Sequence, residues 1–142
     1  MPYLLDSDQC IAALAGQAET VALIEELLAD GCAISIITYM EVYQGILRSP
    51  DPERARAQFQ EFLRGIRIIP LTTPIAERCA ALRQQLKEQG HRVNSRALDL
   101  INAATAMTYQ LILVTRNTAD YADISGLERY DWDGLNRSED QD

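Results

Sequence analysis

Short apolar segments alternate with longer amphipathic segments along most of this chain. The short segments are typical of buried strands, and the longer ones repeat apolar residues every three or four positions, which predicts helices. Strands joined by helices pair in parallel through right-handed crossovers. We therefore expect an α/β fold with three layers (α/β/α), in which helices cover both faces of a mainly parallel sheet of about five strands. The predicted strands are residues 3–5, 33–37, 68–69, 111–114 and 127–130.

Helix ends are marked by capping and helix-breaking residues. A helix is expected to begin at Thr38, directly after the second strand, and the run Ser49–Pro52 predicts a break between two helices. Apolar spacing predicts a long helix that ends near Gly90, since glycine readily adopts the left-handed conformation. Ser95 can cap the next helix, which is expected over about residues 96–108.

The chain is long enough for one hydrophobic core. Its 142 residues are 47% hydrophobic, which predicts one domain over residues 1–135, followed by an acidic, disordered tail at 136–142. No apolar run approaches the roughly 20 residues of a membrane span, and the start lacks the pattern of a secretion signal, so we expect a cytoplasmic protein. Three widely spaced cysteines predict buried thiols instead of disulfides or a metal site.

Four acidic residues are placed where the topology can bring them together. Asp6 follows the first strand, Glu41 lies one turn after the second, and Asp120 follows the strand at 111–114. The carboxyl ends of parallel strands meet at one edge, where α/β proteins bind ligands, and Asp99 joins them if its helix begins there. Carboxylates gathered at one edge repel one another unless a cation binds, and Mg²⁺ or Mn²⁺ suits such oxygen ligands.

Each of these acids also has a purely structural interpretation. Asp6 can cap the first helix, and Asp99 can complement a helix dipole. Glu41 lies three residues after Thr38 in the pattern of a capping box, and Asp120 has the same spacing from Asn117. The coincidence of four such acids, more than any one of them, favours a metal site.

The absence of other chemical groups narrows the possible activity. His91 is the only histidine and Lys87 the only lysine, and both are predicted on the surface. A Ser-His-Asp triad, a zinc hydrolase site and a phosphate-binding loop are therefore unsupported. The net charge of −8 would repel a phosphate backbone unless divalent cations or a basic partner neutralise the contact surface. What remains is metal-assisted hydrolysis by carboxylate ligands.

Four segments together resemble the signature of the PIN-domain family, and most closely its VapC-like toxins. They run in order over nearly the whole chain, from Tyr3 to about Tyr130, which makes the resemblance far more specific than any one segment. Asn102 is a departure, since the family usually has an aliphatic residue there. The segments are Asp6-Ser7-Asp8, Thr38-Tyr39-Met40-Glu41-Val42, Asp99-x-x-x-Ala103-Ala104-Thr105-Ala106, and Leu113-Val114-Thr115-Arg116-Asn117-x-x-Asp120-Tyr121.

The resemblance implies a PIN-like fold and a Mg²⁺-dependent endoribonuclease that leaves 5′-phosphate and 3′-hydroxyl ends, with Mn²⁺ as a possible substitute. One or two ions would be bound directly or through water, with Asp6 and Asp99 as the closest ligands. The resemblance assigns both catalysis and metal binding to Asp6, Glu41, Asp99 and Asp120.

The same resemblance implies supporting residues and partners. Ser7, Thr115 and Asn117 would orient ligands or water, although each can equally be a turn or cap residue. Asn102 can hydrogen-bond Asp99 or a bound water, or be a buried polar residue satisfied by backbone. RNA phosphates would contact Arg92, Arg96 and Arg116, for which solvated surface arginines are the alternative. The expected partners are RNA, a small antitoxin that inserts a segment over the acidic cleft, and a second copy of the chain in a homodimer.

Other functions compete with this interpretation. Asp6 and Asp8 imitate the nucleophile and general acid of haloacid-dehalogenase-like phosphatases, but such enzymes need a cationic partner for the phosphate, and Lys87 is in the wrong context. A housekeeping PIN nuclease would have the same four acids. A non-catalytic binding module on the same fold would be expected to have lost one of them.

Overall fold

The computed structural model describes residues 2–132, and Met1 and residues 133–142 lie outside the described part. The predicted tail at 136–142 and the domain end at 135 therefore remain predictions. Four parallel strands form one sheet in the order β3-β2-β1-β4. Their bounds are β1 Tyr3–Leu5, β2 Cys32–Ser35, β3 Ile66–Ile69 and β4 Ile112–Val114.

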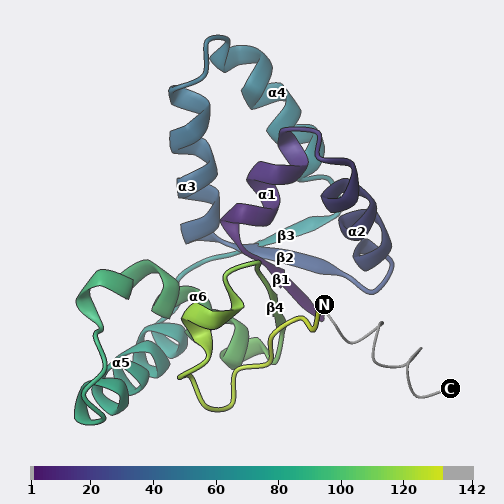
Figure 1. Cartoon of the computed structure of the whole chain (residues 1–142). Helices are drawn as coiled ribbons and strands as arrows, with labels where there is room; N and C mark the ends of the chain where they lie inside the picture. Colours follow the sequence, from purple (N-terminus) through teal and green to yellow (C-terminus); the bar gives the residue numbers. More distant parts are fainter. Residues whose placement is uncertain (1, 133–142) are drawn as a thin grey trace, which may run out of the picture.

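Helices cover both faces of this sheet, as expected for three layers (Figure 1). One layer holds α1 to α4 and the other holds α5 and α6. Two short 3-10 turns, η1 and η2, flank α6 and β4 along the chain. The bounds are α1 Ser7–Leu14, α2 Ala18–Leu28, α3 Ile36–Leu47, α4 Pro52–Phe62, α5 Thr73–Glu88, η1 Asn94–Arg96, α6 Ala97–Tyr109 and η2 Thr118–Tyr121.

The alternation of side chains along the strands produces two cores. Leu4 packs in the core beneath α5 and α6, whereas its neighbour Leu5 packs in the core beneath α1 to α4. Leu113 and Val114 divide in the same way on β4. Strands β1, β2 and β4 are largely buried on both faces, which explains why they are apolar runs in the sequence, whereas Arg67 and Ile68 of the edge strand β3 are exposed.

Several predicted boundaries are confirmed. The break at Ser49–Pro52 separates α3 from α4, where Asp51 accepts a hydrogen bond from the Arg54 amide and Pro52 occupies the first turn. The long helix predicted to end near Gly90 is α5, and Gly90 has a φ of +81°. All three cysteines are buried free thiols, as expected.

Three local predictions are wrong. Helix α3 begins at Ile36 instead of Thr38, because the Ser35 hydroxyl accepts the Thr38 amide and caps the helix. Ser95 does not cap α6, since it lies within η1. The strand expected over 127–130 is reduced to a single parallel bridge between Leu113 and Arg129 at the β4 edge. Among the described helices, none combines the length and the apolar character that crossing a membrane requires.

Candidate active site

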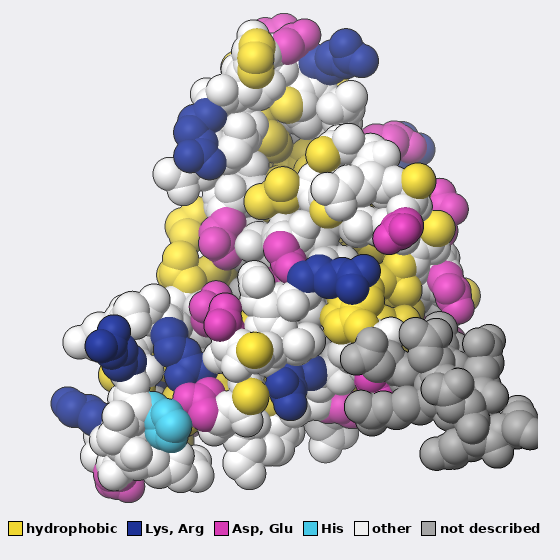
Figure 2. Space-filling view, viewed as in Figure 1, with side chains coloured by type: hydrophobic (Ala, Val, Ile, Leu, Met, Phe, Trp, Pro, Cys, Tyr) yellow, Lys and Arg dark blue, Asp and Glu magenta, His cyan; other side chains and the backbone are white. Residues whose placement is uncertain are grey.

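The carboxyl ends of the central strands bring the predicted site residues together. Asp6 follows β1, which pairs with β2 on one side and β4 on the other. Ser35 ends β2, and Thr115 directly follows β4. Figure 2 shows several acidic side chains on the surface over this part of the molecule, between the regions of α3 and α6 in Figure 1. The topology alone therefore places polar residues from three strands at one edge.

Asp6 is the most buried of the acids, with 6% of its surface exposed. Its Oδ1 accepts hydrogen bonds from the Ser7 amide at 2.8 Å and from Asn102 Nδ2 at 3.3 Å, and its Oδ2 accepts one from the Tyr121 hydroxyl at 3.3 Å. Burial raises the pKa of Asp6, with a smaller opposing effect of the Ser7 hydrogen bond. Asp6 therefore caps α1 and also anchors the site.

Asn102 lies at the centre of a buried polar network. Its Oδ1 accepts a hydrogen bond from the Ser35 hydroxyl, and its Nδ2 donates to Asp6 and, at 3.5 Å, to Thr38 Oγ1. Asn102 thus joins the end of β1 to the start of α3. Of the roles that the sequence leaves open for Asn102, contact with a carboxylate is the one observed, but the carboxylate is Asp6 instead of Asp99.

Glu41 is half-buried in the second turn of α3. Its pKa is raised by burial, then by the negative charges of Asp6 and Asp99, against a hydrogen bond from the Ser7 side chain that lowers it. These interactions place Glu41 within electrostatic reach of both aspartates. The capping box with Thr38 is not formed, because Ser35 already caps this helix.

Asp99 and Asp120 line a shared cavity of about 530 Å³. Asp99 lies in the first turn of α6, and Asp120 is exposed in the 3-10 turn η2. The charge of Asp99 acts on Asp6 and Glu41, so the cavity that Asp99 lines lies close to both of these acids. Within residues 2–132, no group of three or more acidic, histidine or cysteine side chains is packed tightly enough to surround one metal ion. Binding of an ion through all four acids would therefore involve water or a side-chain adjustment.

The loop after β4 is held by Asp8 and Trp132. Asp8 Oδ2 accepts hydrogen bonds from the Arg116 amide at 2.9 Å and from the Thr115 hydroxyl at 3.4 Å, while Trp132 donates to the Thr115 carbonyl. A hydrogen bond from Thr115 also lowers the pKa of Asp6. The Asn117 amide donates to Thr115 Oγ1. Thr115 thus contacts Asp8 and acts on Asp6, whereas Asn117 contacts only the loop.

The three predicted RNA-contact arginines have different surroundings. Arg92 is exposed, and the Arg116 guanidinium lies 3.6 Å from the centre of the Trp132 ring. Arg96 donates two hydrogen bonds to Asp123, at 2.7 and 2.8 Å, and one to the Asp120 carbonyl at 2.7 Å. Arg96 is therefore engaged within the protein, and Arg92 and Arg116 are better placed to meet a ligand.

Sequence analysis did not identify Tyr121 or Asp8 as residues that hold the site together. Tyr121 contributes a buried hydroxyl, but a tyrosine beside an aspartate gives no indication of where its hydroxyl points. The sequence suggested a role for Asp8 only as the general acid of a phosphatase. The sequence signal that could have identified both is their place within the four family-like segments.

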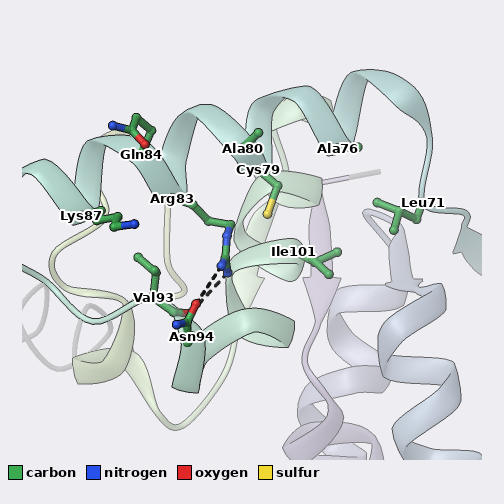
Figure 3. Close-up of a pocket in the computed structure, with 10 residues that line it drawn as sticks. All are labelled: Leu71, Ala76, Cys79, Ala80, Arg83, Gln84, Lys87, Val93, Asn94 and Ile101. Atoms are coloured by element: carbon green, nitrogen blue, oxygen red, sulfur yellow. Dashed lines mark hydrogen bonds between the residues drawn. The ribbon is translucent and has the colours of Figure 1, made fainter.

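A second cavity, of about 450 Å³, lies between α5 and the start of α6 (Figure 3). Arg83 extends across it and donates hydrogen bonds to the Val93 carbonyl and the Asn94 side chain. None of its lining residues is acidic. This cavity is therefore unsuited to a metal-dependent reaction.

Comparisons with known proteins agree with this geometry. The model of the PIN domain family matches residues 3–127. The chain is 29% identical to the "tRNA(fMet)-specific endonuclease VapC" of Shigella flexneri over 93% of this chain and 98% of that protein. It superposes with a TM-score of 0.84 on the crystal structure of VapBC2 from Rickettsia felis bound to a promoter DNA fragment, at 26% identity over 94% of this chain and 100% of that one. A toxin-antitoxin complex from Klebsiella pneumoniae matches with a TM-score of 0.65 and 35% identity, over 88% of this chain and 94% of that one.

Proposed function

The chain belongs to the PIN-domain family, among the VapC-type toxin ribonucleases, and from this premise we propose that it hydrolyses RNA with a divalent cation held by Asp6, Glu41, Asp99 and Asp120. The observation that carries this proposal is the convergence of Asp6, Glu41 and Asp99 at the carboxyl edge of the sheet, where the charge of Asp99 acts on the other two acids. No salt bridge joins any of the three to a basic side chain within residues 2–132. A cation would relieve their mutual repulsion.

The donor atoms of the site fit Mg²⁺, with Mn²⁺ as a substitute. All are carboxylate or hydroxyl oxygens, which hard divalent cations prefer, and no histidine or cysteine faces them in the contacts described above. Asp6 and Asp99 would hold the ion most closely, and Glu41 and Asp120 would hold it directly or through water. Bound there, the ion would lower the pKa of water and stabilise charge on the scissile phosphate.

The protein side chains would orient the reacting groups. Two of these hydrogen bonds, from Ser7 and Asn102, fix one oxygen of Asp6, so its carboxylate needs little reorganisation when it binds. Glu41 lies within electrostatic reach of Asp6 and Asp99, so we assign its carboxylate to orienting the water that the ion would hold. Arg116, stacked on Trp132 beside Thr115, would hold a phosphate of the RNA at the rim, with Arg92 as a more distant contact.

The proposed partners are a protein antitoxin and a second copy of the chain. Similar chains have been crystallised as toxin-antitoxin complexes, and an antitoxin segment with an arginine would neutralise the acids without a metal. For the homodimer, we note exposed apolar side chains on α3 and at the start of α6, among them Met40, which is 49% exposed. The others are Ile36, Leu47 and Leu98.

The decisive experiment measures cleavage of total RNA by purified protein with Mg²⁺, with Mn²⁺ and with chelator. Asp6→Asn and Asp99→Asn should each lower metal-dependent cleavage by about 100-fold or more and leave the fold intact, because each removes a ligand charge. Asp30→Asn is the matched control, since Asp30 is an exposed aspartate in the turn after α2. Near wild-type cleavage by both site variants would refute the assignment of the site.

Two further measurements separate this proposal from its alternatives. A phosphatase would hydrolyse small phosphomonoesters and lose that activity with Asp8→Asn; the engagement of Asp8 with the Arg116 amide argues against this. A toxin expressed without its antitoxin should slow growth, and the antitoxin should restore it. Unimpaired growth at high expression would favour a housekeeping nuclease.

A further inference from the structure

Tyr121 places a single polar atom against the buried carboxylate of Asp6. Its side chain is 1% exposed and packs in the core beneath α5 and α6 with Leu4, Leu100 and Leu113. The hydroxyl donates to Asp6 Oδ2 at 3.3 Å. Burying a phenol hydroxyl without a partner is costly, so this contact fixes the direction of the ring as well as that of the carboxylate.

Tyr121 also lies within electrostatic reach of Asp99. The pKa of Tyr121 is raised by burial, then by the charges of Asp6 and Asp99 and by side-chain hydrogen bonds to both. Asp6 follows β1 and Asp99 lies in the first turn of α6, so a side chain from η2 lies close to acids carried by two distant parts of the chain.

The turn that carries Tyr121 is tied to the start of α6. Arg96, three residues before Asp99, donates two hydrogen bonds to Asp123 and one to the carbonyl of Asp120. These hydrogen bonds hold Asp120 and Asp123, which lie before and after Tyr121 in the sequence. A bidentate arginine-aspartate pair is geometrically specific as well as favourable, which limits how far the turn can move relative to Asp99.

We propose that Tyr121 is a positioning residue whose hydroxyl holds the Asp6 carboxylate, next to Asp99, in the arrangement that binds the divalent cation. Arg96 acts through Tyr121 by fixing the η2 turn. This inference rests on the proposed function, because it assigns the acids to metal binding. It assigns a role to a residue other than the four acids, and it gives a reason for the hydrogen bonds between Arg96 and Asp123.

The test is Tyr121→Phe, which removes the hydroxyl and keeps the ring in the core. We expect Mn²⁺ affinity, measured by titration calorimetry without RNA, to fall by about 10-fold or more, as is usual when a group supporting a metal ligand is lost. Single-turnover cleavage should fall at limiting Mn²⁺ and recover in part at high Mn²⁺, because every ligand remains. Tyr109→Phe is the control, since Tyr109 is an exposed residue at the end of α6.

A second variant tests whether the hydrogen bonds from Arg96 to the η2 turn support Tyr121. Asp123→Asn keeps the Tyr121 hydroxyl but weakens the bonds from Arg96, so Mn²⁺ affinity should fall less than in Tyr121→Phe. Wild-type Mn²⁺ affinity in Tyr121→Phe, with cleavage unchanged at limiting Mn²⁺, would overturn the inference while leaving the proposed function intact. Failure of the wild-type protein to bind Mn²⁺ or to cleave RNA with it would overturn both.

Discussion

Replacing Asn102 with alanine should destabilise the protein more than any change at an exposed asparagine. Asn102 is 1% exposed and forms hydrogen bonds with Ser35 at the end of β2, Thr38 in α3 and Asp6 directly after β1. The substitution breaks these hydrogen bonds and leaves a small cavity. Two of the partners keep another hydrogen bond after the substitution. Asp6 Oδ1 still accepts from the Ser7 amide, and the Ser35 hydroxyl lies 3.5 Å from Thr38 Oγ1.

The expected magnitude follows from these contacts. At about 1 kcal/mol for each buried hydrogen bond, and somewhat more where a polar atom is left without a partner, Asn102→Ala should lower the free energy of unfolding by about 2–4 kcal/mol. For a domain of this size, that corresponds to a fall in Tm of about 6–15 °C. The measurement is urea and thermal unfolding in chelator, so that metal binding does not add to the stability of either protein.

Asn94→Ala is the matched control. Asn94 accepts a hydrogen bond from Arg83 at 3.1 Å, but the contact is exposed to water. Its loss should change the free energy of unfolding by less than about 0.5 kcal/mol. If Asn102→Ala is also within about 0.5 kcal/mol of the wild-type protein, the buried network does not hold β1 to α3, and the reasoning is refuted.

Other predictions follow from the charges and thiols of the structure. The pKa values of Asp6 and Glu41 are raised in the folded protein. Without metal, the stability that they contribute is therefore fully present below the unfolded pKa and is lost as pH rises through the folded pKa. Glu41→Gln should flatten the stability-pH curve over this range when it is measured in chelator. Arg96 lowers the pKa of Asp123, so the stability that this pair contributes is present above the unfolded pKa of Asp123 and is lost as pH falls through the folded pKa. Asp123→Asn should lower the free energy of unfolding by about 1–2 kcal/mol near neutral pH and reduce the loss of stability in acid. Burial raises the pKa of Cys32 to about 11, so native protein should react with a thiol reagent at pH 8 only after denaturation, and rapid reaction would contradict the buried thiols.

The layered architecture could be predicted from the sequence because it depends on local patterns. The spacing of apolar residues identified β1, β2, β4 and α5, and a chain that alternates strands with helices has few topologies available. The position of Asp6 at the carboxyl end of a strand followed from the same rule. The pKa values of Asp6 and Glu41 are raised, first by burial and then, to a smaller extent, by the charges of neighbouring acids.

Helix starts were predicted less well, because competing caps lie within a few residues of one another. Thr38 and Ser35 are both acceptable N-caps by residue type, and only the backbone at the end of β2 decides that Ser35 has the extended conformation a cap requires. The strand predicted at 127–130 depends on pairing with β4, which reaches only Arg129. Local propensity carries no information about either outcome.

The sequence by itself determined the fold class, the set of acids and their approach to one edge of the sheet. The tertiary structure alone decided which side chains support them. Asn102 meets Asp6 across 96 positions in the chain, and Arg96 meets Asp123 across 27. Such contacts depend on the distance and direction of side chains after the helices have packed on the sheet, whereas sequence periodicity specifies only the face on which each residue lies.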